Sequence, residues 1–430
     1  MNKTVVLPTS DLPRIVIVGA GFAGLKLAKK LANKKFQVVL IDKNNFHQFQ
    51  PLFYQVATSG LEPSAISFPL RKALQRIPNV KFRMAELVEV HPKEKYIETN
   101  IGNISYDKLV LSFGATTNFF GMKDFEKYAI PMKSVSQAIY LRNTILNRFE
   151  QAINERDREK QKALMSAVVV GGGPTGVELA GALAEMKKYI LPKDYPDIDP
   201  ELMQIHLVEA NPNLLTGFAE KSTSKTSEFL KELGVKVHLA TKVSSYDGEQ
   251  IQIGEELIQV KNLIWAAGIC IPKIKGIPES VFHRGGRWKV NSLNEVDEMN
   301  NVYAIGDMAY METGKFPNGH PQVAQVAIQQ ANNLANTLIK GEKTAKDFKY
   351  SDKGSMATIG RNLAVANLPG IKLHGFTAWC LWLFVHLMSI LGTKNRMFVF
   401  INWMWSYFSY DQSLRLLIKP FIKDDTLSDK

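Results

Sequence analysis

Apolar and polar positions along the chain predict the same unit twice: a buried strand, a glycine-rich turn and a helix. The first copy, IVIVGAGFAGLKLA, spans Ile15–Ala28, and the second, VVVGGGPTGVELAG, spans Val168–Gly181. The residues before the glycines are apolar and mostly β-branched without alternation, which is typical of a parallel strand buried on both faces. At 430 residues the chain is long enough for two or three domains, so the repeat fits a division into separate domains.

The first turn has the glycine spacing of a nucleotide-binding loop. Gly19, Gly21 and Gly24 give G-x-G-x-x-G. The first glycine allows the tight turn, the second lets the backbone approach a pyrophosphate, and the third lets the helix pack on the strand. The helix N-terminus supplies free N–H groups for the anion. The next strand, within Gln37–Lys43, ends in Asp42, 18 residues after Gly24, where an acid can bind an adenosine ribose.

The second turn repeats this arrangement with a wider gap before its acid. Gly171, Gly173 and Gly176 have the same spacing, and the next strand ends in Glu209, 33 residues after Gly176. The segment Met186–Leu202 reads as an insertion that accounts for the gap. A carboxylate at Glu209 accepts hydrogen bonds from a free ribose 2′-hydroxyl and repels a 2′-phosphate, so this site favours NAD over NADP.

Two complete fingerprints imply two bound dinucleotides, and electron transfer between a flavin and a nicotinamide is the economical explanation. Three later stretches are expected to return strands to these nucleotides and to bring backbone close to them. An aspartate at the end of the last stretch can bind the ribityl hydroxyls of a flavin. The stretches are KLVLSFGATTN with Gly114, NLIWAAGI with Ala267 and Gly268, and NVYAIGDMAY with Gly306 and Asp307.

The C-terminal part of the chain carries two aromatic, almost uncharged runs. Gly375–Leu391 and Met397–Tyr410 are separated by a hinge that holds Lys394 and Arg396. Each run is shorter than the roughly 20 residues of a spanning helix, and its tryptophans and tyrosines favour the lipid–water boundary. We expect two helices that lie in the interface. A buried core, a dimer surface, or a spanning first run are the alternatives.

Charge and cysteine content narrow the function classes. The net charge is +12 and 45% of the residues are hydrophobic. Nucleic-acid binding is not expected, because no run of like charges and no zinc-finger spacing accompanies the basic balance. Arg415, Lys419 and Lys423 recur at four-residue spacing and suit anionic lipid headgroups. The two cysteines, Cys270 and Cys380, form no C-x-x-C pair, and no secretory signal is evident, so an intracellular protein is expected.

Taken in order, the motifs resemble those of the two-dinucleotide-binding-domain flavoproteins over about residues 12–340. The resemblance implies an α/β fold with two Rossmann-like dinucleotide-binding domains. The first fingerprint and the late Gly-Asp motif then build an FAD domain over residues 1–162 and 290–350. The second fingerprint builds an NADH domain over residues 163–289. Residues 351–430 form the third part, an amphipathic, membrane-docking helical region.

The electron acceptor is suggested by the helix expected after the Gly-Asp motif. Disulfide reductases and sulfide:quinone oxidoreductases need cysteines that the chain lacks. In GHPQVAQVAIQQ, Gly319–Gln330, small alanines leave room for a flat ring, and a glutamine amide can bond a quinone carbonyl. With the aromatic tail, Ala324, Gln325 and Gln329 make the chain similar to the type II NADH dehydrogenases. That family implies NADH:quinone oxidoreduction through FAD without proton pumping, on the cytoplasmic side of the cell membrane as a peripheral, monotopic protein; a homodimer is left open.

Individual roles follow the same resemblance. Glu178, in the T-G-V-E setting of the second fingerprint, is implied to lie near nicotinamide and flavin, with a helix-dipole role as its alternative. His47, Phe53 and Tyr54 follow the first acid and suit either the flavin and quinone sites or core packing. Lys353 is a weak candidate for supplying a quinone proton. No metal-ligand spacing is evident among the histidines. A soluble reductase of a carrier protein and a nucleotide-sensing flavoprotein remain the alternative functions.

Overall fold

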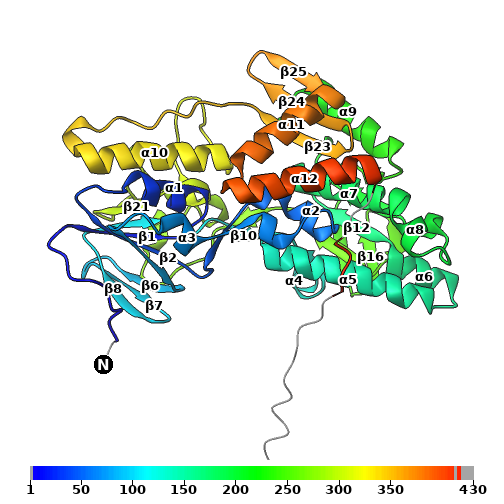
Figure 1. The fold of residues 1–430 in the computed structure, drawn as a ribbon, viewed down its shortest axis with the longest axis horizontal. Coiled ribbons are helices and arrows are strands. Elements are labelled where there is room, and N and C mark those ends of the chain that lie inside the picture. Colours follow the sequence, from blue (N-terminus) through cyan, green and yellow to red (C-terminus); the bar gives the residue numbers. More distant parts are fainter. Residues whose placement is uncertain (1–2, 411–413, 418–430) are drawn as a thin grey trace, which may run out of the picture.

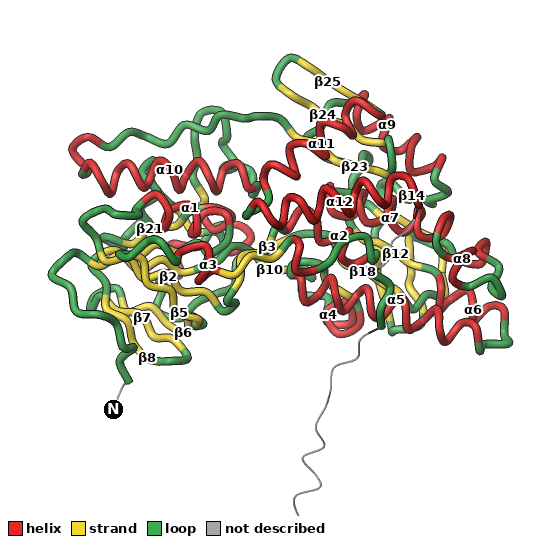
Figure 2. The backbone as a smooth tube through the Cα atoms, in the orientation of Figure 1, coloured by secondary structure: helices red, strands yellow, loops and turns green. Residues whose placement is uncertain are grey.

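Two parallel sheets organise the molecule in the computed structural model, which describes residues 3–410 and 414–417 (Figure 1). Figure 2 shows their strands as two separate groups, each surrounded by helices. The first sheet has the order β21-β9-β1-β2-β5. Its strands are β1 (Arg14–Val18), β2 (Gln37–Asp42), β5 (Val80–Met84), β9 (Lys108–Leu111) and β21 (Val302–Ala304).

Both faces of the first sheet are buried. Ile15 and Ile17 of β1 pack into a core with α1 (Phe22–Lys30) and α10 (Ala324–Lys340). Val16 and Val18 point to the other face. They pack there towards the small antiparallel sheet of β6 (Leu87–His91), β7 (Tyr96–Thr99) and β8 (Gly102–Ser105). Burial on both sides explains why β1 reads as a continuous apolar run and not as an alternating one.

The second sheet repeats this plan with the order β11-β18-β12-β13-β14. Ala167 and Val169 of β12 face the core that includes α7, and Val168 and Val170 face the antiparallel sheet β15-β16-β17. The elements are β12 (Ala167–Val170), β13 (Ile205–Val208), β14 (Lys236–His238), β18 (Asn262–Trp265), α7 (Pro174–Tyr189), β15 (Val243–Tyr246), β16 (Gln250–Ile253) and β17 (Glu256–Gln259).

The second sheet also recruits chain from before residue 163, where we expected the domain boundary. Its edge strand β11 (Ile130–Pro131) pairs with β18, and the buried side of α5 (Val135–Ile153) packs in the same core as α7. The expected insertion, Met186–Leu202, holds the end of α7, α8 (Leu191–Asp194) and a 3-10 turn, η3 (Pro200–Leu202). The division into three parts remains a prediction in its exact residue numbers.

The C-terminal part forms a hairpin sheet and two helices that lie across the second domain (Figure 1). The strands are β23 (Ser355–Gly360), β24 (Leu363–Leu368) and β25 (Ile371–His374), and the helices are α11 (Phe376–Ser389) and α12 (Thr393–Ser409). Trp382, Ile390 and Val399 pack into the core that surrounds α7. Within the described residues, every helix is too short or too polar to cross a lipid bilayer.

The remaining elements connect these layers. They are β3 (Phe46–Gln48), η1 (Gln50–Leu52), α2 (Phe53–Ala57), η2 (Pro63–Ala65), β4 (Ser67–Pro69), α3 (Leu70–Leu74), β10 (Thr116–Thr117), α4 (Lys123–Tyr128), α6 (Arg158–Met165), α9 (Glu220–Glu232), β19 (Ile269–Cys270), η4 (Glu279–Val281), η5 (Arg284–Gly286), β20 (Trp288–Lys289), η6 (Gly306–Met308), β22 (Ala309–Tyr310) and η7 (Glu342–Thr344).

Candidate functional site

The first glycine turn has the geometry that a nucleotide needs. Gly19 has a φ of +97°, and a Cβ on Gly24 would lie 1.8 Å from the carbonyl oxygen of Gly19. A Cβ on Gly21 would meet nothing within 4 Å, so open space lies in front of the second glycine. Asp42 Oδ2 accepts the backbone N–H of Ala20 at 2.7 Å. Burial raises the pKa of Asp42, and the N–H groups that it accepts lower that pKa by less.

The second turn is built in the same way. Gly171 has a φ of +114°, a Cβ on Gly176 would lie 1.8 Å from the Gly171 carbonyl oxygen, and the space in front of Gly173 is open. Glu209 Oε2 accepts the backbone N–H of Gly172 at 2.5 Å. Both helices that follow, α1 and α7, begin at a glycine without a side-chain cap. Their first N–H groups are therefore available to an anion.

The loops that follow β9 and β18, one from each sheet, meet each other. Gly114 follows β9 and Gly268 follows β18, and both adopt a positive φ. Just beyond these glycines, β10 and β19 pair as antiparallel strands through Thr116 and Cys270. A Cβ on Gly268 would lie 2.4 Å from the ring of Phe120, so only glycine fits there. Ala267 precedes this glycine, and the pairing of β10 with β19 connects the two sheets at the carboxyl ends of β9 and β18.

Three motifs that are distant in sequence converge at Gly306. A Cβ on this residue would lie 3.4 Å from the Cβ of Ala327 in α10 and 3.5 Å from the Cβ of Ala23 in α1. Its backbone N–H donates to Gln330 Oε1 at 2.7 Å. Asp307 follows and lies 3.9 Å from Lys133 Nζ. Burial raises the pKa of Asp307, and the positive charges of Lys133 and Arg287 oppose the rise.

The two glutamines of the α10 motif bind backbone. Gln325 Nε2 donates to the Gly354 carbonyl at 2.8 Å, and its Oε1 accepts the N–H of Lys353 at 3.1 Å. Gln329 does the same with both backbone groups of Ser351, at 2.9 and 3.0 Å. Both amides thus form hydrogen bonds with the backbone of the segment 351–354, which leads to β23. Ala324 begins the helix, and the Lys353 side chain is exposed to solvent.

A cavity of about 100 Å³ lies between the second nucleotide helix and the C-terminal helices. Glu178 and Glu185 of α7 and Tyr54 of α2 are among its polar lining residues. Its other lining residues come from α2, α7, the β23–β24 hairpin and the two tail helices, and they are largely aromatic on the tail side. They are Gln55, Thr58, Gly60, Ala182, Thr358, Ile359, Gly360, Arg361, Trp379, Trp382, Leu383, Trp403, Ser406 and Tyr407.

Glu178 is the buried acid of this cavity. Burial raises its pKa to about 8, and the nearby backbone N–H of Thr358 and indole of Trp382 oppose the rise. A carboxyl with this pKa holds a proton at neutral pH and can give it up to a stronger base. Tyr54, packed against Trp382 with 6.4 Å between ring centroids, bonds to Gln55, which in turn accepts the indole N–H of Trp403 at 2.8 Å.

The remaining sequence candidates around the first turn, His47 and Phe53, are buried and make contacts within the protein. His47 Nδ1 lies 2.9 Å from the Ala20 carbonyl oxygen, and the His47 ring packs edge-on against Phe22. Burial lowers the pKa of His47. Phe53 is buried in the core beside α7. The structure therefore brings Tyr54 into the cavity, whereas His47 supports the glycine turn from below.

The tail helices present an apolar surface on the side away from the protein. Phe408, Trp405 and Phe384 are 72%, 64% and 63% exposed. Their exposed neighbours are Phe376, Val385, Met388, Met397, Phe398, Phe400, Ile401 and Met404. On the side of α12 that faces the protein, Arg361 donates to the backbone carbonyls of Ser406 and Tyr407 at 2.9 and 3.1 Å.

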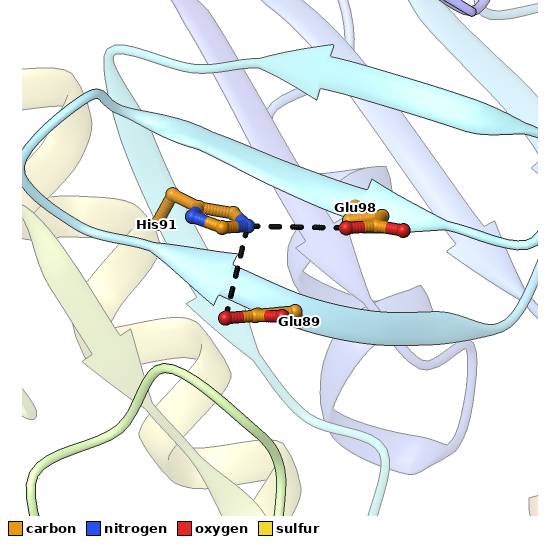
Figure 3. Close-up of side chains that lie close together, drawn as sticks. All are labelled: Glu89, His91 and Glu98. Atoms are coloured by element: carbon orange, nitrogen blue, oxygen red, sulfur yellow. Dashed lines mark ion pairs between the residues drawn. The ribbon is translucent and has the colours of Figure 1, made fainter. Parts of the chain in front are cut away.

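Two side-chain groupings were missed by sequence reasoning. Glu89, His91 and Glu98 gather on the β6–β7 hairpin, with His91 Nε2 4.0 Å from a carboxylate oxygen of each glutamate (Figure 3). The sequence shows Glu89 and His91 two residues apart, which places them on one face of a strand. Glu98 joins them from the neighbouring strand, and this pairing depends on the register between the two strands.

Arg415, which we expected to meet lipid headgroups, instead bonds to Asp194 at 3.1 Å. Lys419 and Lys423 lie outside the described residues.

Two glycine turns, each followed by an uncapped helix, are typical of an oxidoreductase that uses a pyridine nucleotide. The family described as pyridine nucleotide-disulphide oxidoreductase matches residues 13–331, and the NDH2 C-terminal domain matches residues 353–409. The type II NADH:quinone oxidoreductase Ndh of Mycobacterium tuberculosis is 33% identical over 423 residues, which cover 94% of this chain and 90% of that protein.

Two further comparisons agree. The external NADH-ubiquinone oxidoreductase 2 of Saccharomyces cerevisiae mitochondria is 31% identical, over 92% of this chain and 81% of its own. The NDH2 structure from Plasmodium falciparum in complex with NADH superposes with a TM-score of 0.86 at 24% identity, covering 95% of this chain and all of that one. The chain belongs to the pyridine nucleotide-disulphide oxidoreductases and, within them, to the type II NADH:quinone oxidoreductases.

Proposed function

We propose that this chain oxidises NADH at its second glycine turn and passes the electrons, through FAD held at the first turn, to a quinone that arrives from a membrane. Electron transfer from NADH to quinone through a flavin is the activity of the type II enzymes. The proposal adds the residues that carry it out. Its main support is the cavity in which Glu178, on the helix of the NADH turn, faces the aromatic tail helices.

The residues of the first turn fit FAD. Open space in front of Gly21 and Gly114 is the room that a pyrophosphate and a ring system need, because a Cβ there would meet no protein atom. Asp42 is placed to bind the ribose, and Asp307 the ribityl chain. Gly19, Gly24 and Gly306 bring the surrounding backbone close. When bound, FAD supplies the two-electron redox chemistry that side chains lack.

The second turn is the proposed NADH site. Gly171, Gly173 and Gly176 shape the pyrophosphate loop, and Glu209 selects the unphosphorylated ribose. Ala267 and Gly268 lie on the loop that meets the first lobe, so they are placed beside the nicotinamide end. The pairing of β10 with β19 connects the two lobes, which supports a close approach of the two cofactor rings when both are bound.

The cavity beside α7 is the proposed route and proton source for the quinone. Trp379, Trp382 and Trp403 offer flat apolar faces to a quinone ring, and Glu178 holds the proton that quinone reduction consumes. We propose that Ala324 leaves room at the start of α10. Gln325 and Gln329 contribute by holding the segment 351–354 in place, since each amide already bonds to backbone there.

The exposed aromatic face of the tail is the proposed membrane contact. A contiguous apolar surface of this kind is rare on monomeric soluble proteins and marks a site of interaction. We propose that α11 and α12 lie in the headgroup region as peripheral, monotopic anchors on the cytoplasmic side, which places the cavity next to the lipid phase. A second copy of the chain covering the same face is the alternative occupant.

Purified protein provides the test. Denaturation should release one FAD per chain, identified by chromatography. NADH consumption should depend on added menaquinone or ubiquinone analogues, should be slow with NADPH, and should persist with lipid vesicles as the only source of quinone. Release of FMN, or turnover with a soluble carrier protein but with no quinone, would contradict the proposal and favour the soluble reductase.

A further inference from the structure

The cavity contains a second acid, Glu185, to which the proposed function assigns no role. Glu185 lies seven residues after Glu178 on α7, which places both side chains on one face of the helix, about 10 Å apart along its axis. Both line the same cavity, and burial raises the pKa of each carboxyl. The two acids therefore face the same cavity.

We propose that Glu185 is a proton-relay residue, which reloads Glu178 after each quinone reduction. The inference rests on the proposed function. Glu185 does not touch the quinone, so it acts through Glu178 and is not itself a catalytic residue. Its proton comes from solvent at the end of the cavity where Arg361 lies.

A relay needs the proton to pass from Glu185 to Glu178, and the groups around the two acids favour that direction. Glu185 Oε1 accepts the backbone N–H of Arg361 at 2.6 Å, and the positive charges of Arg361 and Lys188 oppose the rise of its pKa. The groups that oppose the rise of the Glu178 pKa, the backbone N–H of Thr358 and the indole of Trp382, are uncharged. From α2, Tyr54 faces both carboxyls. The tail helices contribute only uncharged side chains to the described lining of the cavity.

A path between the acids is present in the lining. Tyr54 is close enough to both carboxyls that, after burial, their charges help to raise its pKa. Its hydroxyl accepts from Gln55 Nε2 at 2.7 Å, which leaves the hydroxyl hydrogen free to donate into the cavity. The cavity volume of about 100 Å³ has room for several waters, and its polar lining offers them partners.

In the overall reaction, NADH, quinone and one proton give NAD⁺ and quinol, and the proton transfers between the acids keep this balance. The two electrons come from NADH. As the last O–H bond of the quinol forms, the O–H bond of Glu178 breaks and leaves a carboxylate. That carboxylate regains a proton through the hydroxyl and water path as the O–H bond of Glu185 breaks. Glu185 then takes a proton from solvent.

The test compares Glu185→Gln with Glu178→Gln and with Glu201→Gln, a control whose side chain is 83% exposed nearby. Stopped-flow mixing measures the two half-reactions separately. In E185Q we expect reduction by NADH to be unchanged, and reoxidation by a short-chain quinone to slow about tenfold near pH 8, less at lower pH. Glu185→Asp should restore part of the rate, and E201Q should behave as wild type.

Infrared difference spectra supply a readout that is independent of turnover. Between about pH 5 and about pH 10, the wild type should lose buried carboxylic-acid absorbance, and E178Q and E185Q should each remove part of it. A spectrum unchanged by E185Q, or a wild-type rate and pH profile for its reoxidation, would overturn the relay alone. If the wild type itself is not reoxidised by any quinone, the proposed function fails instead. If E185Q does not fold, the reoxidation rate of E185D and the infrared difference spectrum of the wild type still test the relay.

Discussion

Gly172 donates its backbone N–H to Glu209 over 2.5 Å, and Ala20 donates in the same way to Asp42 over 2.7 Å. Each acid also accepts the N–H of the residue two positions further on, Asn44 or Asn211. The two acids that we propose to bind ribose are thus tied to their own glycine turns by the same pair of bonds. A substitution there changes both the charge and the shape of one nucleotide site, and leaves the other intact.

Removing the charge of Glu209 should relax the choice of nucleotide. Glu209→Gln keeps the side-chain length but removes the repulsion of a 2′-phosphate, so kcat/KM for NADPH relative to NADH should rise about tenfold, or about 1.4 kcal/mol. Steady-state kinetics with both nucleotides measure this. Asp42→Asn is the matched control, and it should lower FAD content without altering the nucleotide preference. An unchanged ratio for E209Q would place the nicotinamide nucleotide elsewhere.

A single methyl group should distinguish the two sites. Gly21 and Gly173 have ordinary extended backbone and open space at the Cβ position, so alanine should not disturb folding. Gly173→Ala should weaken NADH binding about tenfold or more at unchanged FAD content, whereas Gly21→Ala should lower FAD content. Titration calorimetry and absorbance measure the two effects. Equal losses of both ligands in either variant would contradict the assignment.

The buried acid should make stability depend on pH. Glu178 has a raised pKa of about 8 in the folded chain, so the unfolded chain releases its proton first as pH rises from about 4.5. The native state then binds more protons, and stability falls with pH until about 8. Glu178→Gln should remove this slope and stabilise the protein above neutral pH, by at most about 4–5 kcal/mol at about 1.4 kcal/mol per unit.

Urea unfolding of wild type and E178Q at several pH values checks this. The two free-energy curves should converge near pH 4 and separate progressively towards pH 8. Curves that run parallel over this range would mean that Glu178 is ionised in the native state at neutral pH, which would also remove it as a proton donor.

The exposed tail residues should determine membrane binding. Phe408→Glu and Trp405→Glu each remove an apolar side chain worth about 1.5–3 kcal/mol when buried, so each should weaken binding to lipid vesicles about tenfold or more. Co-sedimentation with vesicles measures this. Leu257→Glu is the control, because Leu257 is similarly exposed, at 61%, but lies on β17, which packs on the face of the second sheet opposite to α7 and the tail helices. Equal effects of all three substitutions would reject a docking role for this face.

The hydrogen bonds of Gln325 and Gln329 to the segment 351–354 give a further prediction. Gln325→Leu and Gln329→Leu each remove two hydrogen bonds to the segment 351–354, so each should destabilise the protein by about 1–3 kcal/mol. Thermal unfolding measures this loss, and quinone KM should change only through looser packing of the tail. A large rise in quinone KM without loss of stability would show that the amides contact the quinone directly.

Local patterns carried most of what the sequence could predict. The glycine turns were predictable because the clash of a Cβ on Gly24 or Gly176 with the first glycine involves only residues within one turn. The tail helices were predictable because their aromatic runs have clear ends, and the runs coincide with α11 and α12 within a few residues. Short-range geometry and composition determine such features, whatever the rest of the fold does.

Features that depend on distant segments were not predictable. The surroundings of Glu178 come from α2, β23 and the tail, which are far from it in sequence. The amides of Gln325 and Gln329 could not be assigned to backbone before the path of residues 351–354 was known. Glu98 faces Glu89 only through strand register. A single sequence without pairing information cannot specify these partners.

Rapid mixing of the purified protein tests the central claim most directly. The protein as isolated should be yellow, should lose its flavin absorbance on mixing with NADH, and should regain it when a short-chain quinone follows in a second mixing step. Two results would contradict this account. One is a flavin that dithionite bleaches but NADH does not. The other is a bleached protein that no quinone recolours, because electrons would then not pass from NADH at the second turn, through FAD at the first turn, to a quinone beside the tail.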